Sequence, residues 1–398
     1  MKNQPRKTAI LKRVVEKETP TAKRRKEILK FADKVKRKVE EVARKQNIRI
    51  EVTIEGSVEK DTWLQSEADI DIFLLAPENV DRKTLETAYL KTARKALTEL
   101  ELHPIERFSE HPYVEAFTKR KIKLDLVPCF KVIPPKWKSA TDRTPHHTEY
   151  VKTHLKPEQK SETRILKRFL KGIGVYGADI KTRGFSGYLT ELLILAYGNF
   201  TDTLENASKW TVQEKVDIEG YHEIVKKDIE SLFDSPLIFI DPVDKYRNVA
   251  AAVARNSFDI FRTASKVFLE KPNINYFYPK KTTPYKPEYL SKLISGKHAH
   301  YIFLKINNVQ GPPDIIWGQL YKTEKAINHL LKNAEFRVLR SKCWSDEKRY
   351  CVLIFELDNV TISNVKKHYG PPIISDQELS FTSKYLTENQ TVGTVGKF

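Results

Sequence analysis

The chain has 398 residues, of which 70 are Lys or Arg and 52 are Asp or Glu, so its formal net charge is +18. This length accommodates two or three domains, and the basic excess favours a polyanionic partner such as nucleic acid over a surface that is basic only for solubility. Its three cysteines lack Cys-x-x-Cys spacing, which argues against a disulfide framework or a zinc site. No apolar run could span a membrane and the charged N-terminus lacks the apolar core of a signal peptide, so we expect a cytoplasmic protein.

The first predicted elements are a helix and a strand. Residues 1–18 are polar and basic, and Thr19-Pro20 is typical of a helix start. Apolar residues recur at helical spacing through residues 22–46, which predicts a helix that packs on a sheet and exposes a basic face. Residues 48–54 alternate apolar and polar side chains, which predicts a strand with one buried face.

A tight turn is expected directly after this strand, at Gly56-Ser57. Glycine lets the backbone turn sharply, and the residues after it can begin a helical turn. The amide groups at such a helix start can hold phosphate oxygens. The dipeptide alone is a weak signal, so its meaning depends on the segments that come after it in the chain.

Two strand-like segments carry carboxylates after the turn. Residues 69–75 read Asp-Ile-Asp-Ile-Phe-Leu-Leu, so Asp69 and Asp71 point to the same face of a strand. Asp125 lies between two leucines in the apolar segment 123–128. Three carboxylates on neighbouring strands beside a phosphate cradle are typical of a two-metal phosphoryl-transfer site, for which Mg²⁺ is the usual ion. For the Asp-x-Asp pair alone, two solvated carboxylates at a strand edge are the alternative.

The remaining segments of this region predict one helix and two strands. We expect a helix over residues 81–101 and strands over 105–117 and 121–132, which together form a small mixed sheet with helices on one side. Residues 142–148 are expected to be a polar loop with two adjacent histidines. One histidine is expected to contact a phosphate or nucleotide, because neighbouring loop residues seldom hold a metal without further ligands.

Residues from about 151 to 270 are predicted to be mostly helical. The segment 161–171 is an amphipathic basic helix in which Lys167 shares a face with Lys171. Glycines end it, and Tyr176 between them is expected to be exposed enough to stack on a base. A small-residue helix is predicted to begin at Arg247, where an anion or a base edge could bind.

The last part of the chain interleaves aromatic, proline and basic residues. Its predicted order is strand, helix, strand, strand, over residues 301–306, 316–333, 336–343 and 349–357. Aromatic and basic side chains together permit base stacking and phosphate contact, which suits an RNA-binding module. A purely structural α+β domain is the alternative.

In this order the motifs resemble those of the archaeal (class I) CCA-adding enzymes, which are tRNA nucleotidyltransferases. The resemblance runs through about residue 370 and rests chiefly on Gly56-Ser57, Asp69-Ile70-Asp71, Leu124-Asp125-Leu126-Val127-Pro128, Tyr176-Gly177, Asp241-Pro242-Val243-Asp244 and Arg247-Asn248-Val249-Ala250. It implies an α+β fold with a nucleotidyltransferase head with a mixed sheet (1–145), a helical neck (146–270) and an α+β RNA-binding body with a reduced tail (271–398).

The resemblance also implies an activity and a set of site residues. CMP and AMP from CTP and ATP would be added to the 3′ end of tRNA without a template, with Mg²⁺ as cofactor and pyrophosphate released. Asp69, Asp71 and Asp125 would be catalytic and ligate the metals. Nucleotide contacts would come from Gly56, Ser57, Lys60, His147, Lys167, Tyr176 and Arg247, the last helping to choose the base. The expected partners are tRNA, ATP and CTP but no membrane, and a homodimer is left open.

One motif departs from the family pattern. Glu59-Lys60-Asp61 stands where the family usually has Ala-Arg-Gly. Lys60 keeps a positive charge but lacks the bidentate fork of arginine, and the two acids are expected to add negative charge near a triphosphate. Two alternatives therefore stay open: an enzyme that adds only A or part of CCA, and a non-catalytic RNA-binding relative.

Overall fold

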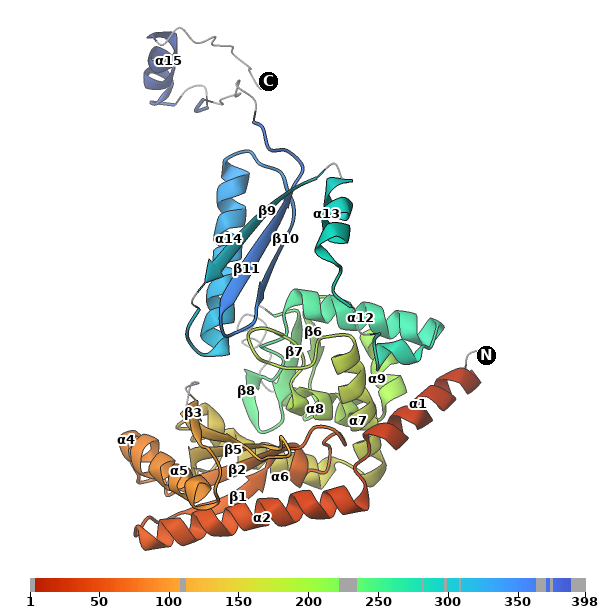
Figure 1. Ribbon diagram of the computed structural model, residues 1–398, viewed down its shortest axis with the longest axis vertical. Helices are drawn as coiled ribbons and strands as arrows, with labels where there is room; N and C mark the ends of the chain where they lie inside the picture. The colour runs from red at the N-terminus through yellow and green to blue at the C-terminus, as the bar shows by residue number, and fades with distance from the viewer. Residues whose placement is uncertain are drawn as a thin grey trace. The chain divides into compact units, whose positions relative to one another are not determined.

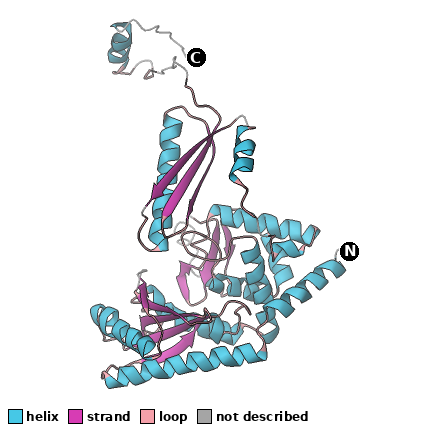
Figure 2. Ribbon diagram, in the orientation of Figure 1, coloured by secondary structure: helices cyan, strands magenta, loops and turns pink. Residues whose placement is uncertain are grey.

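The computed structural model describes residues 4–107, 112–221, 235–280, 283–296, 299–307, 309–362, 370–372 and 375–387. The chain divides into two compact units, one formed by residues 1–284 with 310–319 and the other by residues 285–309 with 320–398. Figures 1 and 2 show the elements of each unit. The predicted head and neck both lie in the first unit.

A five-stranded mixed sheet is the centre of the N-terminal half of the first unit. Its strands are β1 (Glu51–Glu55), β2 (Asp69–Ala76), β3 (Ile105–Arg107), β4 (Tyr113–Phe117) and β5 (Lys123–Phe130). They lie in the order β1-β2-β5-β4-β3, with β2 and β5 parallel and the other pairs antiparallel. This confirms the mixed sheet, although the strand predicted over 105–117 is two strands, with residues 108–111 outside the described part of the chain.

Helices cover one face of this sheet. They are α2 (Ala22–Lys45), α4 (Arg82–Thr84), the π-helix η1 (Leu85–Tyr89) and α5 (Leu90–Glu99). Ile70 and Ile72 of β2 point into the core that α2 and α5 share with the sheet. Because side chains alternate along a strand, Asp71 points to the opposite face.

The N-terminal helices differ from the prediction in two respects. Helix α2 is capped by the hydroxyl of Thr21, which accepts the Arg24 amide at 3.2 Å, so the cap is two residues beyond the predicted Thr19. Residues expected only to be polar form the helix α1 (Gln4–Glu18), which buries Val14. Ile10, Leu11, Val14 and Val15 recur at helical spacing and pack on the core, so the sequence does carry a periodic signal for this helix.

The second half of the first unit is mostly helical. Its helices are α6 (Thr144–His154), α7 (Pro157–Gly172), α8 (Gly187–Tyr197), α9 (Phe200–Ala207) and α12 (Arg255–Glu270), with short 3₁₀ turns η2 (Ala140–Arg143) and η3 (Ile274–Tyr276). A small sheet has the order β6-β7-β8, from β6 (Glu214–Val216), β7 (Leu237–Asp241) and β8 (Asp244–Asn248). Phe169 lies at the centre of the core, with four further phenylalanine rings within 6.4 Å of it.

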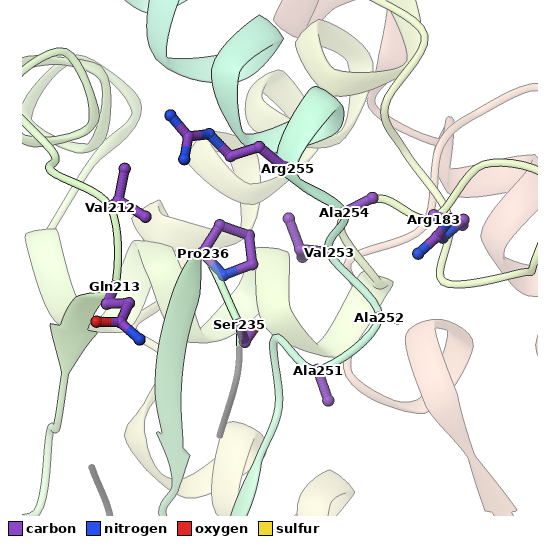
Figure 3. Close-up of a pocket in the computed structure, with 10 residues that line it drawn as sticks. All are labelled: Arg183, Val212, Gln213, Ser235, Pro236, Ala251, Ala252, Val253, Ala254 and Arg255. Carbon is purple, nitrogen blue, oxygen red and sulfur yellow. The ribbon is translucent and has the colours of Figure 1, made fainter. Parts of the chain in front are cut away.

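Two predicted elements in this half are wrong. The polar loop predicted over 142–148 is instead η2 followed by the first turn of α6, because Pro145 suits the start of a helix and cannot break it there. The small-residue helix predicted from Arg247 is absent, since Arg247 is in β8 and a turn follows it. Figure 3 shows residues 251–254 of this turn running without helical winding into Arg255, the first residue of α12, along a hollow of about 360 Å³.

The second unit confirms the predicted strand-helix-strand-strand order. Its strands are β9 (His300–Asn307), β10 (Val338–Ser345) and β11 (Tyr350–Leu357), in the antiparallel order β10-β11-β9. Its helices are α13 (Pro287–Ser295), α15 (Glu378–Thr387) and the greater part of α14 (Pro313–Asn333). Among the described residues, no helix is both long and apolar enough to cross a membrane.

The buried carboxylate of Asp142 is predicted to stabilise the end of β5. It accepts the backbone amides of Phe130, Lys138 and Ser139 at 2.7–2.9 Å. Asp142→Ala should leave these donors without an acceptor and lower the free energy of unfolding by about 3 kcal/mol in urea melts. Asp33→Ala is the control, because Asp33 pairs with Arg37 on the surface and should change stability by less than ~0.5 kcal/mol.

Candidate active site

A row of acidic side chains crosses the face of the five-stranded sheet opposite α2 and α5. Asp71 on β2 lies opposite Asp125 on β5 in the parallel register. Glu55 on β1 is the cross-strand partner of Asp71, and Glu115 on β4 is that of Asp125. Directly opposed residues point to the same face, so four carboxylates line up across four strands. The predicted pair of Asp71 and Asp125 is therefore adjacent, with Asp69 exposed two residues before Asp71.

The turn at Gly56 brings the backbone against this row. Gly56 begins the short helix α3 (Gly56–Glu59) with a φ of +70°, in the left-handed region that favours glycine. A Cβ at this position would lie 2.0 Å from Oδ2 of Asp71, so only glycine fits. Ser57 is partly buried in the first turn of α3. The predicted Gly-Ser turn and the first carboxylate strand thus meet at one place.

Close approach of the acids disfavours their ionised forms. Burial, followed by the negative charges of Asp125 and Asp69, raises the pKa of Asp71 to about 7. Burial also raises the pKa of Asp125, although Lys123 opposes the shift with an ammonium 2.6 Å from Oδ2. Lys123 also lies 3.4 Å from Glu115. The row is therefore only partly neutralised by the chain's own cations.

The residues present fit a divalent cation that shares its ligands with a bound phosphate. Oδ1 of Asp125 is buried and has no hydrogen-bond partner. In the described residues, no group of three or more His, Cys, Asp or Glu side chains is placed to hold a metal ion by itself. Mg²⁺ commonly uses one or two carboxylates together with substrate phosphates, and Asp71 and Asp125 supply such a pair. This pair of carboxylates thus suits the use of a divalent metal.

Two predicted nucleotide-binding lysines meet at a buried acid that the prediction missed. Nζ of Lys60 lies 2.5 Å from Oε2 of Glu191, and Nζ of Lys167 lies 3.0 Å from Oε1. The Thr62 hydroxyl donates to the same Oε1 at 2.5 Å. Burial alone would raise the pKa of Glu191, but the two lysines lower it to about 2. Glu191 lies within an apolar helix, where a fully buried acid is a signal that a cation must be near.

A second buried acid, Asp241 at the end of β7, gathers two further predicted residues. It accepts Nε2 of His147 at 2.9 Å, Nη1 of Arg247 at 2.8 Å and the Tyr188 hydroxyl at 3.2 Å. The Tyr188 ring stacks on His147 at 4.0 Å between centroids and lies 5.8 Å from Nζ of Lys60. The structure thus brings His147 and Arg247 together, next to Lys60.

The two acids that flank Lys60 are both paired, so they do not add free negative charge beside a triphosphate as the sequence had suggested. Glu59 lies 2.5 Å from Nζ of Lys152. Asp61 is 2.6 Å from Nη2 of Arg164 and 2.9 Å from Nη2 of Arg25. The departure from the family motif is thus compensated within the first unit.

Tyr176 follows α7, near Lys167, and its side chain is less exposed than predicted. Its ring is partly buried against the neck core, with Nζ of Lys171 4.6 Å from the centroid. Its hydroxyl would be 3.1 Å from a Cβ on Gly187, and Lys167 is 4.0 Å from the same point. The sequence pattern does not reveal this packing. Because the ring is partly buried, it has less free surface for stacking on a base than the sequence predicted.

Family models match three successive parts of the chain. A nucleotidyltransferase domain matches residues 33–147, the second domain of tRNA nucleotidyltransferases matches 161–278, and the C-terminal domain of CCA-adding enzymes matches 301–397. The last match extends beyond residue 370, where the resemblance of the motifs ends.

Curated relatives match over most of their length. The chain is 36% identical to the CCA-adding enzyme of Methanosarcina barkeri, over 96% of this chain and 82% of that one. It is 38% identical to the CCA-adding enzyme of Methanosarcina acetivorans, over 94% and 80%. The CCA-adding enzyme of Saccharolobus islandicus is 36% identical, over 90% and 82%.

Solved structures with little sequence similarity share the fold. A cytoplasmic RNA terminal U-transferase superposes with a TM-score of 0.53 at 14% identity, over 70% of this chain and 99% of that one. The Cid1 poly(U) polymerase superposes with a TM-score of 0.54 at 14% identity, over 70% and 97%. The nucleotidyltransferase fold and the α+β class are thereby confirmed.

The raised pKa of Asp71 predicts how the stability of the metal-free protein depends on pH. Folding raises this pKa from 3.8 to about 7, so the folded state binds more protons than the unfolded state between these values. Stability should therefore fall as the pH rises from 4 to 7, by on the order of 3 kcal/mol from this group. Asp71→Asn should remove that fall in melts with EDTA, and Mg²⁺ should restore stability above pH 7 only in the wild type.

A second variant, Asp81→Asn, separates the effect of Asp71 on the pH dependence of stability from that of another acid. Asp81 caps α4 through the Thr84 amide at 2.8 Å, and this contact keeps the pKa of Asp81 below its usual 3.8. Asp81→Asn should therefore lower stability without changing the slope between pH 4 and 7. An Asp71→Asn slope equal to that of the wild type would contradict the assigned cause.

Proposed function

This chain belongs to the family of the CCA-adding enzymes, and we propose that it adds CMP and AMP from CTP and ATP to the 3′ end of tRNA without a nucleic-acid template. The observation that carries the proposal is the acid row beside the Gly56 turn, in a chain whose three parts match the family in order. The non-catalytic alternative needs a degenerate head, whereas Asp71 and Asp125 are adjacent and the acids beside Lys60 are paired.

The proposed reaction is an in-line attack of the tRNA 3′ hydroxyl on the α-phosphate, with pyrophosphate leaving. Asp69, Asp71 and Asp125 are the groups that would hold divalent cations, with Mg²⁺ the proposed ion. Such cations, when bound, lower the pKa of the attacking hydroxyl and neutralise the triphosphate. The parallel register of β2 and β5 fixes the spacing of Asp71 and Asp125, so these acids do not need to reorganise for the reaction.

The other predicted residues surround the place where the nucleotide would lie. Gly56 and Ser57 lie at the start of α3, where the Gly56 amide donates to the Thr148 hydroxyl at 3.4 Å, and Lys60 and Lys167 add positive charge for the triphosphate. Arg247 and His147 are both fixed by Asp241, and in the proposal they face the base and sugar. Arg247 is the more exposed of the two, which suits contact with a base edge.

The second unit offers a surface for the tRNA itself. Helix α14 lies over one face of its sheet, where Asn328 donates to the Ser341 hydroxyl at 2.7 Å. The residues that alternate with Ser341 and its cross-strand partners point to the other face, which we call the open sheet face. It carries Tyr301, Phe303, Lys305, Arg340, Lys342, Trp344 and Tyr350.

The open sheet face combines exposed rings with cations. Phe303 is 53% and Trp344 50% exposed. The ring centroids of Trp344 and Tyr350 are 5.8 Å apart, and Nζ of Lys305 is 4.7 Å from the centroid of the Tyr350 ring. Rings can stack on exposed nucleotides while the cations contact phosphates, so this face is proposed to bind tRNA.

Asp71→Ala should abolish incorporation of labelled CMP and AMP into tRNA that lacks its terminal CCA, because one of the acids that would hold the metals is lost. Binding of the same tRNA, measured by filter retention, should change by less than about twofold. Detectable incorporation by this variant would rule out the mechanism. Wild-type reactions with CTP alone, ATP alone and both nucleotides distinguish full CCA addition from addition of A or of part of CCA.

Trp344→Ala should weaken tRNA binding about tenfold, since loss of one stacked base costs about 1–3 kcal/mol. Lys342→Gln should instead reduce the dependence of the Kd on salt concentration, as loss of one phosphate contact does. Leu330→Ala is the control, because Leu330 is 65% exposed on α14, which covers the opposite face. Equal tRNA affinities for Trp344→Ala and Leu330→Ala would exclude the open sheet face.

A further inference from the structure

We propose that Glu191 is a positioning residue for the nucleotide triphosphate, which holds the ammonium groups of Lys60 and Lys167 as one fixed pair of cations. This inference rests on the proposed function, because it requires that the two lysines meet a triphosphate. It assigns a role to a residue in α8 that is neither part of the acid row nor a predicted nucleotide contact.

The geometry joins three elements at one carboxylate. Lys60 ends the turn of α3, Lys167 is in α7 and Glu191 is in α8, and all three residues are at least 93% buried. Each lysine contacts a different oxygen of Glu191, at 2.5 and 3.0 Å. The Thr62 hydroxyl accepts from Lys167 at 3.0 Å and donates to Glu191, which closes the cluster.

The charge balance distinguishes this cluster from a simple buried ion pair. One carboxylate faces two ammonium groups, so the cluster has a net charge of +1 when all three groups are ionised. Two buried ammonium groups without the acid would repel each other and favour loss of a proton. Burial already lowers the pKa of Lys167, with Lys60 and Arg164 adding to the shift and Glu191 opposing it. Glu191 thus keeps both cations charged where a polyanion needs them.

The cluster lies next to the other predicted nucleotide contacts. Lys60 is 5.8 Å from the Tyr188 ring, which stacks on His147. Lys167 approaches Gly187 together with the Tyr176 hydroxyl. Lys60 also acts on the charge of Asp71, whose pKa it lowers against the effect of burial. A paired cation at Glu191 is therefore within electrostatic reach of both the acid row and the His147 region.

A purely structural role is the competing explanation. Buried ion pairs are weak evidence for stability, because desolvation of the charges offsets much of their attraction. A structural role predicts that loss of Glu191 changes melting temperature and all activities together. A positioning role predicts a selective loss of nucleotide affinity that depends on pH, since the lysines then deprotonate more easily.

The test is Glu191→Gln in the full chain, which keeps the size of the side chain and one acceptor. Binding of ATP without tRNA, measured by calorimetry at pH 7, 8 and 9, should be about tenfold weaker at pH 7 and weaken further as the pH rises. Wild-type affinity should change by less than threefold over the same range. The KM for ATP should follow the same pattern, with a smaller change in kcat and an unchanged affinity for tRNA.

Two further variants make the result independent of folding defects. Lys60→Met combined with Glu191→Gln keeps the net charge of the wild type, so it should melt close to the wild type while its ATP affinity stays low. Glu67→Gln is the matched control, because Glu67 pairs with Lys171 of α7 at 2.5 Å but touches neither Lys60 nor Lys167. It should bind ATP within about twofold of the wild type at each pH.

Folded Glu191→Gln with wild-type ATP affinity at every pH would overturn the inference, as would recovery of that affinity in the double variant. Failure of the proposed function gives a different result. In that case the wild type itself would add no nucleotide to tRNA that lacks CCA, whatever the behaviour of Glu191→Gln.

Discussion

The electrostatic repulsion within the acid row is the constraint on which the rest of the first unit depends. Four carboxylates on one sheet face are unfavourable unless cations approach them, and Lys123 approaches only one end of the row. Gly56 is required because the Asp71 carboxylate occupies the space of a side chain. The helices α2 and α5 pack on the opposite face; in the row, Glu55 and Glu115 are buried, Asp71 and Asp125 are partly exposed, and Asp69 beside them is exposed. The sheet thus carries excess negative charge at one place, which additional cations would stabilise.

The helical second half of the first unit contributes two buried acids that hold cationic and polar side chains near this negative charge. Glu191 and Asp241 each collect cationic or polar side chains from different elements, and these side chains then border the sheet. Long lysine and arginine side chains would otherwise lose considerable rotamer freedom on binding a ligand. Holding them in advance reduces that entropic cost, so the two acids pre-organise the site although neither is expected to touch the nucleotide.

The sequence predicted the elements with strong periodicity and the residues with distinctive chemistry. The mixed sheet, the Asp-Ile-Asp strand and the order of the second unit are confirmed, because alternation and helical spacing are local signals. Glu191 and Asp241 were missed as parts of the site, since a buried acid is recognisable only once its partners from distant segments are known. Arg247 was placed in a helix because its small-residue neighbours suit one, whereas pairing with β7 overrides that preference. Tyr176 was expected to be exposed, whereas tertiary packing leaves its ring partly buried.

The contact between His147 and Asp241 limits which ligand atom the imidazole can meet. Asp241 is ionised, since contacts with His147 and Arg247 lower its pKa despite burial, so Nε2 must carry the hydrogen. The neutral ring then has only a lone pair at Nδ1, which complements a hydroxyl or an amino group. A phosphate oxygen would require a hydrogen on Nδ1 as well, and therefore the doubly protonated, charged imidazolium. Burial lowers the pKa of His147, which disfavours the charged imidazolium. Tautomer choice at one residue therefore favours a sugar or base over a phosphate as its complement.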